Sequence, residues 1–259
     1  MLLGVDHLVI AVSSPEAAAE VLARDLGLGV TGGGRHETMG TYNRLAFLGD
    51  TYLELIGVFD AGLVRSSRAF AVGNAALAFL EASGEGLATY ALATDGVRGD
   101  VARLRAAGSP IGEPVEGQRV RPDGEAVRWV TAFPELGPER APFLIEHEMT
   151  GAEWGAQARA ARAAYQHPGG GRVRLAGVEL PVADPGAVAR EYGTVLGIAF
   201  SEGLRTVVGE QQIALREGAG TPIVTLHGET GTEPLEVARL GVLWRRVPAP
   251  VAAPDQGTP

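Results

Sequence analysis

Residues 12–30 read VSSPEAAAEVLARDLGLGV, and residues 182–200 read VADPGAVAREYGTVLGIAF. The two stretches align without gaps at an offset of 170 residues, sharing a valine, a proline, two alanines, a leucine and a glycine. In each copy a β-patterned run leads into a Ser-Pro or Asp-Pro pair, at 14–15 and 184–185. The Ser or Asp can cap a helix, and proline suits its first position. Each copy therefore predicts a strand, a helix and a Leu-Gly stop, which indicates a repeated module.

Strand-like runs and turns follow the first helix. Residues 44–48 and 52–58 are strand-like and are separated by Gly-Asp, a turn pair, which makes the unit β-α-β-β-β. A second unit begins near Gly86, with a helix at 97–107 and later strands in VRWVTAF and PFLIEHE. A third begins near Arg172 and runs through RTVVG, QQIALRE and PIVTLHG.

The expected organisation follows from these units. The pattern predicts helical connectors at 66–82 and 154–165 that join them. We expect paired modules at 1–150, a helical and glycine-rich linker at 151–171, a shorter third module at 172–247 and a disordered tail at 248–259. Because a lone module cannot bury its sheet face, the third is expected to pack on the first pair or on a partner chain, as in a homodimer.

Composition restricts the classes of function. The chain has 259 residues, 46% of them hydrophobic, no cysteine and a formal charge of −9. Any metal must therefore take nitrogen and oxygen ligands. Its scattered basic residues predict neither a nucleic-acid nor a membrane partner, but a small-molecule ligand or substrate. Without a signal peptide or a spanning segment, a cytoplasmic location is expected, and abundant Ala, Gly and Arg suggest a bacterial source.

Five stretches resemble the glyoxalase-like family of the vicinal-oxygen-chelate superfamily: DHLVIAVSSPEAAAEVLARDLGLGV, GGGRHETMGTYNRLAFLGDTYLELIGV, RPDGEAVRWVTAFPEL, APFLIEHE and RLAGVELPVADPGAVAREYGTVLG. The resemblance covers nearly the whole chain. It implies an α+β fold of β-α-β-β-β modules whose curved mixed sheets enclose a cavity, commonly with a divalent metal at its floor. Superfamily activities include glyoxalase, extradiol dioxygenase, epimerase and antibiotic sequestration or modification, so the fold does not settle the reaction.

His7 and Glu54 are the best-marked candidate site residues. Strand alternation places each on the face opposite its apolar neighbours, which suit packing under the helix. A buried carboxylate between two leucines needs a partner or a ligand. In the superfamily these two strand positions carry first-module metal ligands. An imidazole with a carboxylate suits Zn, Fe, Mn, Co or Ni.

The second module offers a third candidate in PFLIEHE. There Phe143 and Ile145 share one face, which leaves Glu146 on the other and makes it resemble the second-module carboxylate ligand. His147 is the rival, but the same alternation points it toward the helix side.

The remaining ligand position departs from the four-ligand glyoxalase pattern, because it falls on Ala88 or Thr89. The resemblance thus leaves His7, Glu54 and Glu146 as a three-ligand site with open positions for substrate or water. The alternative is that His7 bonds a carboxylate neighbour in a pocket that holds no metal.

Two further clusters are candidates for substrate binding. Glycines in GGGRHETMGTYN permit close backbone approach. Its polar side chains could bind an anionic or carbonyl-rich ligand, or lie solvated in a mobile hairpin loop; they are Arg35, His36, Thr41 and Asn43. Arg128 or Trp129 could clamp a carboxylate or stack on a ring, or could lie on an exposed strand face.

Two functions compete on these residues. The first is a divalent-metal-dependent lyase, isomerase or dioxygenase acting on a small oxygen-rich molecule, in which Glu54 or Glu146 loosened from the metal serves as the base. The second is a metal-free protein that binds or sequesters a small molecule in the same cavity through Arg35, His36 and Trp129.

Overall fold

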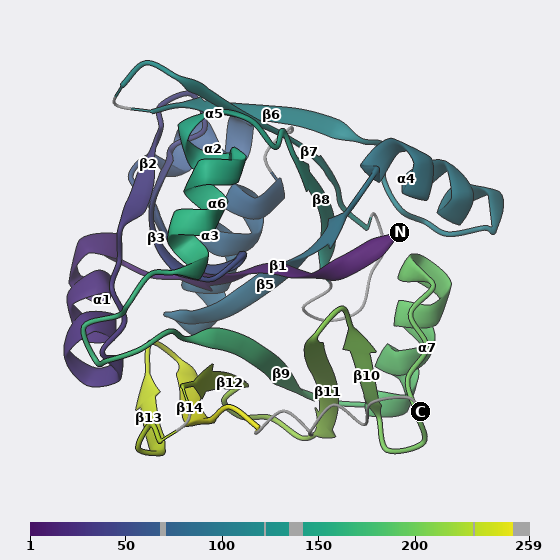
Figure 1. Cartoon of the computed structure of the whole chain (residues 1–259). Coiled ribbons are helices and arrows are strands. Elements are labelled where there is room, and N and C mark those ends of the chain that lie inside the picture. The colour runs from purple at the N-terminus through teal and green to yellow at the C-terminus, as the bar shows by residue number, and fades with distance from the viewer. Residues whose placement is uncertain (68–70, 122, 135–141, 230, 251–259) are drawn as a thin grey trace, which may run out of the picture.

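The computed structural model describes residues 1–67, 71–121, 123–134, 142–229 and 231–250 (Figure 1). The elements of the first module are β1 (Leu2–Ala11), α1 (Pro15–Val21), the π-helical turn η1 (Leu22–Leu26), β2 (Gly32–His36), β3 (Thr41–Leu48) and β4 (Thr51–Val58). The connecting helices and the second module are α2 (Ala61–Ser66), α3 (Ala71–Ser83), β5 (Gly86–Thr94), α4 (Val97–Ala106), β6 (Val115–Val120), β7 (Ala126–Ala132) and β8 (Phe143–His147).

The second half of the chain begins with the connector helices α5 (Gly151–Trp154) and α6 (Ala156–Ala163). The third module then comprises β9 (Arg174–Val182), α7 (Pro185–Leu196), β10 (Arg205–Val208), β11 (Gln211–Glu217), β12 (Ile223–Gly228), β13 (Leu235–Arg239) and β14 (Val242–Pro248). The hairpin of β13 and β14 extends beyond the strands that the sequence pattern indicated.

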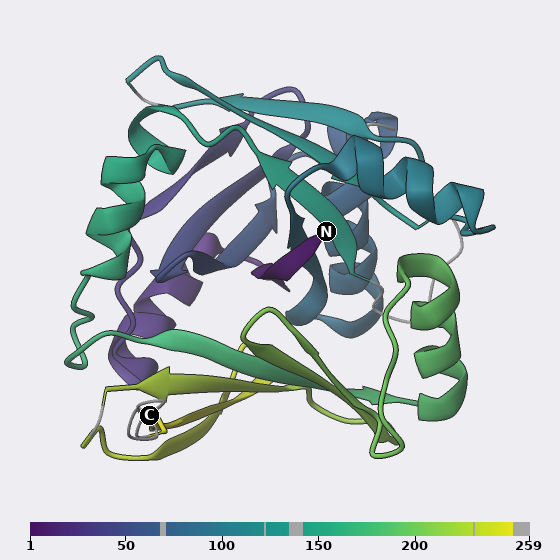
Figure 2. The same ribbon diagram turned by 45° about the vertical axis from the view of Figure 1, so that its right-hand side comes forward.

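Two curved mixed sheets organise these strands, which confirms the expected α+β class. The larger has the order β2-β3-β4-β1-β5-β8-β7-β6, and the smaller has the order β10-β11-β9-β12-β14-β13. In the larger sheet β1 is parallel to β4 and antiparallel to β5, so the first two modules join through their first strands. In both views the larger sheet curls around helices, with the smaller sheet beneath it (Figures 1 and 2).

The repeated helix starts and stops behave as the sequence predicts. Ser14 and Asp184 cap α1 and α7, and each side chain accepts a hydrogen bond from the backbone N–H three residues on, at 3.2 and 2.8 Å. Gly27 and Gly197 follow the two Leu residues with φ of 66° and 69°, a left-handed conformation that costs glycine little.

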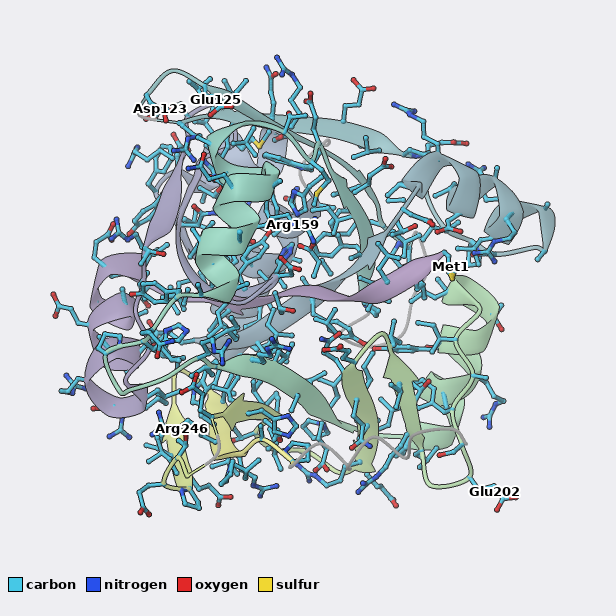
Figure 3. All side chains as sticks on the ribbon, in the orientation of Figure 1. Met1, Asp123, Glu125, Arg159, Glu202 and Arg246 are labelled. Carbon is cyan, nitrogen blue, oxygen red and sulfur yellow. The ribbon has the colours of Figure 1, made fainter. Side chains whose placement is uncertain are left out.

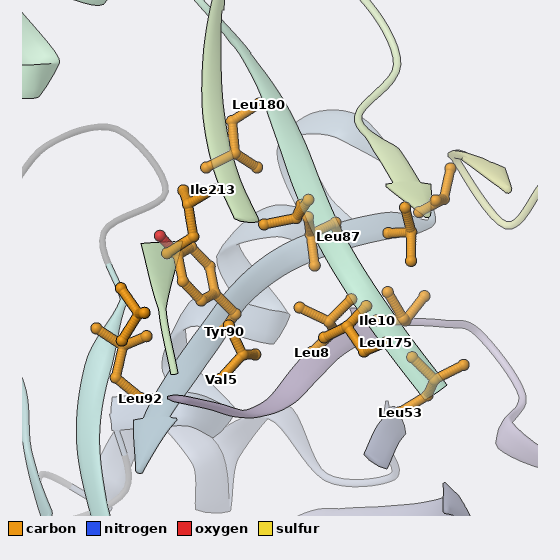
Figure 4. Close-up of a cluster of buried hydrophobic side chains, with 14 of the residues drawn as sticks. Val5, Leu8, Ile10, Leu53, Leu87, Tyr90, Leu92, Leu175, Leu180 and Ile213 are labelled. Carbon is orange, nitrogen blue, oxygen red and sulfur yellow. The ribbon is translucent and has the colours of Figure 1, made fainter. Parts of the chain in front are cut away.

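The third module packs on the convex side of the larger sheet. Figure 4 shows Leu8 of β1 in the same buried cluster as Leu175 and Ile213 of the smaller sheet. At this interface the hydroxyls of Tyr90 and Tyr192 are 3.0 Å apart, and both rings are fully buried. The smaller sheet thus buries its apolar face within the same chain.

Several local expectations change. The glycine-rich run forms strand β2, paired with β3, rather than a loop. The helix expected at 66–82 is divided into α2 and α3, with residues 68–70 outside the described part. Most of the tail, residues 251–259, also lies outside it. Among the described residues, no helix is long and apolar enough to span a membrane.

Candidate functional site

A cavity of about 60 Å³ lies on the concave face of the larger sheet. That volume suits a few water molecules or a small organic fragment. Its polar wall includes His7, His36, Asn43, Glu54 and His147. Its apolar wall includes Trp129, Phe143, Ile145 and Trp154. The cavity therefore combines apolar surface with a small number of convergent polar groups, which is typical of sites for small molecules.

His7 is held in one orientation by its sequence neighbour. Its Nδ1 is 2.6 Å from Asp6 Oδ1, and its ring stacks on Tyr52 with the centroids 4.5 Å apart. A carboxylate only accepts hydrogen bonds, so Nδ1 carries the proton that is donated to Asp6. The other ring nitrogen, Nε2, is thereby directed at Glu54, whose Oε2 is 3.6 Å away.

Glu54 is 7% exposed and is fixed by an amide. Asn43 Nδ2 donates to Glu54 Oε1 at 2.6 Å, while Asn43 Oδ1 accepts from the Gly34 N–H at 2.9 Å. The two Asn43 contacts orient its amide, so its donor side faces the carboxylate. This leaves Glu54 Oε2 as the oxygen that faces His7.

Asp6 connects His7 to a second histidine, because His147 Nε2 lies 3.1 Å from Asp6 Oδ1. Burial by itself would raise the pKa of the Asp6 carboxyl. The interaction with His147 and the hydrogen bonds from both histidines outweigh it and hold that pKa well below its usual range. His147 also stacks on Trp154, with centroids 3.8 Å apart. Asp6 is therefore a buried, ionised acceptor for two histidines.

His36 and Thr41 form a hydrogen-bonded pair beside the cavity. His36 lines the cavity, and its Nδ1 is 2.8 Å from the Thr41 hydroxyl oxygen. Thr41 is fully buried. Burial lowers the pKa of His36, although the nearby Glu54 raises it in part. Desolvation thus favours a neutral His36 imidazole in the cavity wall.

The alternation expected for β8 is reversed. Phe143, Ile145 and His147 line the cavity, whereas Glu146 faces the other way and its Oε2 accepts a hydrogen bond from the Val97 N–H at 3.0 Å. Glu146 therefore holds the beginning of α4 and does not approach His7. The reason is that both faces of β8 are buried, so apolar residues mark neither face as the one under the helix.

Arg35 and Arg128 lie outside the cavity. The Arg35 guanidinium packs over the Phe59 ring at 3.8 Å and pairs with Glu37. The Arg128 side chain is 57% exposed, with its Nη1 3.6 Å from Glu148 Oε2. Both side chains are exposed surface charges.

Trp129 does line the cavity, and a glycine makes room for it. A Cβ atom on Gly117, the residue opposite in β6, would lie 2.2 Å from Trp129 Nε1. The indole therefore crosses the neighbouring strand at a distance that only glycine permits.

Arg119, Glu153 and Trp154 are cavity residues that the sequence analysis did not single out, and the last two fall in the expected linker at 151–171. The two linker residues belong to α5 and form part of the cavity wall. Figure 3 shows Glu125 near α5, where its carboxylate accepts a hydrogen bond from the Ala152 N–H at 3.0 Å and holds the start of that helix. No local pattern in the sequence marks such a long-range contact.

The donor set does not fit a protein-held divalent metal. Among the described residues, no three His, Asp or Glu side chains converge as a metal site. His7 and Glu54 provide two donors, Glu146 points away, and the remaining ligand position falls on Ala88 or Thr89. We therefore derive no chemical step through a metal.

Residues 5–196 match a family described as the glyoxalase-like domain. Because this span covers well over half of the sequence, the chain belongs to the glyoxalase-like family, as the resemblance implied. No curated protein matches the chain.

Solved structures resemble this chain to different extents. A hypothetical protein from Staphylococcus aureus has a TM-score of 0.76 and 15% identity, over 96% of this chain and 100% of its own. Methylmalonyl-CoA epimerase from Streptomyces coelicolor has a TM-score of 0.42 and 23% identity, over 56% of this chain and 97% of its own. The epimerase from Mycobacterium tuberculosis has a TM-score of 0.42 and 20% identity, over 55% and 87%. The first similarity shows that the three-module fold recurs; none assigns an activity.

Proposed function

We propose that this chain is a lyase or isomerase that takes a proton from a small oxygen-rich molecule, with Glu54 as the proton acceptor. The observation that carries the proposal is the buried pair of His7 Nε2 and Glu54 Oε2, 3.6 Å apart. Each of the two side chains is fixed by a further hydrogen bond, His7 by one to Asp6 and Glu54 by one from Asn43. Side chains fixed in this way need little rearrangement when the reaction begins.

The pair can hold and return one proton. Because His7 Nδ1–H is committed to Asp6, a proton taken from the substrate resides on Glu54 or on His7 Nε2. A general base must lie within hydrogen-bond reach of the proton that it abstracts, and both atoms face the cavity. Before the transfer Nε2 and Oε2 are both acceptors, and after it the proton on one of them faces the other as its acceptor.

The aromatic walls support the same chemistry. Trp129, Phe143 and Trp154 would pack against the carbon skeleton of a bound molecule and displace water. Electrostatic interactions strengthen where water is removed, which favours proton transfer between fixed groups.

Proton exchange in D2O tests the proposal. Hydroxyacetone, dihydroxyacetone, pyruvate and malonate carry C–H bonds next to a carbonyl, and proton NMR reports their deuteration. We expect the wild-type protein to accelerate exchange in at least one of them, and Glu54→Gln to abolish it. Glu148→Gln, at an exposed carboxylate, is the matched control.

The competing functions give different results. A metal-free binding protein would be stabilised by one of these compounds, insensitively to chelator, without exchanging its protons. A metal-dependent enzyme would lose exchange on chelation and regain it with Zn, Fe, Mn, Ni or Co. Either result would contradict the proposal.

A further inference from the structure

Arg119 is a buried cation in the wall of the cavity. It lies in β6 at the edge of the larger sheet, where the flanking Gln118 and Val120 are exposed while Arg119 itself is only 7% exposed. Arginine is rarely buried unless it is paired or bound. Its burial therefore calls for an anionic partner inside the cavity.

Glu153 from α5 is that partner within this chain. Arg119 Nη2 lies 2.5 and 2.6 Å from the two carboxylate oxygens of Glu153. Among the described residues, Arg119 Nε and Nη1 make no hydrogen bond. A guanidinium carries five N–H donors in a planar fork that matches a carboxylate through two nitrogens. Glu153 thus contacts only one nitrogen of the guanidinium, which can bind a carboxylate through two nitrogens.

Glu153 has a second cation at the cavity rim. Its Oε2 is 3.3 Å from Arg121 Nη1, and the Arg121 side chain is 24% exposed. Arg121 does not line the cavity, whereas Arg119 does. The Glu153 carboxylate can therefore turn outward to Arg121 and release Arg119 without losing its ionic partner.

The reacting pair and the cation surround the same buried ring. Tyr52 lines the cavity together with Glu54, Glu153 and Arg119, and burial is the main cause that raises its pKa. Tyr52 also stacks on His7. A small molecule in the cavity is thus enclosed by walls that include both Glu54 and Arg119.

We propose that Arg119 binds a carboxylate group of the substrate, and that Glu153 occupies this place until the substrate arrives. The inference rests on the proposed function for the identity of the reacting end, and it narrows the substrate class to small oxo- or hydroxycarboxylates. The entering carboxylate takes the Arg119 fork through two nitrogens while Glu153 moves to Arg121. Because one carboxylate replaces another, Arg119 never lies buried without an anion.

Binding of small acids and of their uncharged amides tests this inference. The probes are pyruvate, lactate and malonate with pyruvamide, lactamide and malonamide, titrated at low ionic strength by calorimetry and tryptophan fluorescence. Replacing Glu153 by Gln removes the internal competitor, so we expect it to tighten binding of at least one acid about 10-fold. Arg119→Gln is expected to weaken the same acid about 10-fold or more and to leave its amide unchanged.

Arg128→Gln and Glu148→Gln are matched controls, because this exposed pair lies outside the cavity. If Arg119→Gln does not fold, the titration of Glu153→Gln still tests the inference. An unchanged or weaker affinity of Glu153→Gln for all three acids overturns the inference, as does equal binding of acids and amides.

Failure of the two proposals is distinguishable, since this titration does not measure proton exchange. Arg119-dependent binding of acids without exchange would support the anion site and contradict the role of Glu54. Proton exchange that depends on Glu54, with no preference for acids over amides, would support the role of Glu54 and contradict the anion site.

Discussion

His7 and Glu54 lie on neighbouring parallel strands, with His7 Nε2 3.6 Å from Glu54 Oε2 in the wall of the cavity. Neither side chain holds this position by itself, since Asp6 fixes the imidazole and Asn43 fixes the carboxylate. Changes to these supporting residues should therefore have measurable effects on stability.

Removing the Asn43 amide should leave the Glu54 carboxylate without its donor. Hydrogen bonds to charged groups contribute about 1.5–3 kcal/mol, so Asn43→Ala should lower the free energy of unfolding by about 2 kcal/mol. Urea denaturation measures the change. In a Glu54→Gln background the same substitution should cost less, because a neutral amide needs the donor less. Equal costs in both backgrounds would show that the contact carries no charge-dependent energy.

The lowered pKa of Asp6 predicts a pH-dependent contribution to stability. A carboxyl with a folded-state pKa below its unfolded value of about 3.9 stabilises the fold above that value. That contribution is lost as pH falls toward the folded-state pKa. Asp6→Asn should thus be less stable than wild type by about 2 kcal/mol at neutral pH, and the difference should shrink below pH of about 4. A difference that stays constant from neutral to acid pH would contradict the assignment.

Glu146 should behave as a helix cap. Because its side chain accepts the Val97 N–H at the start of α4, Glu146→Ala should destabilise the protein by about 1 kcal/mol. Thermal or urea unfolding measures the loss. Ligand binding in the cavity should stay unchanged. A large loss of binding would show that Glu146 contributes to the site and would contradict this assignment.

The interface with the third module provides another check. Tyr192→Phe should leave the Tyr90 hydroxyl buried without its partner, at a cost of about 1–3 kcal/mol. The double substitution to phenylalanine removes both polar groups and should cost less than the single one. If the double variant lost as much as the sum of the two single variants, no coupling would exist across the interface.

The sequence predicted the site residues on β1 and β4, where apolar side chains mark only one face of the strand as the core face. In β1, Leu8 and Ile10 pack in the core shared with the third module, while His7 faces the cavity as the alternation predicts. Glu54 follows the same rule in β4. The internal repeat likewise predicted the helix caps, because capping residues act within one turn of chain.

Strand alternation failed to place side chains correctly where both faces of a strand are buried. Leu144 and Ile145 are both buried, on opposite faces of β8, so the pattern could not place Glu146. In β6 the apolar Val120 is exposed and Arg119 is buried, because Arg119 lines the cavity and pairs there with Glu153. Trp154 reaches the site through a connector whose position depends on long-range contacts, and local sequence carries no sign of them.

Proton exchange by two isosteric variants tests the central claim most directly. Glu54→Gln and Glu146→Gln each replace one buried-strand carboxylate, and only the first lies in the cavity. For a compound that the wild-type protein deuterates, Glu54→Gln should reduce the rate by about 100-fold or more. Glu146→Gln should remain close to the wild-type rate. Undiminished exchange in Glu54→Gln, or an equal loss in both variants, would contradict the account.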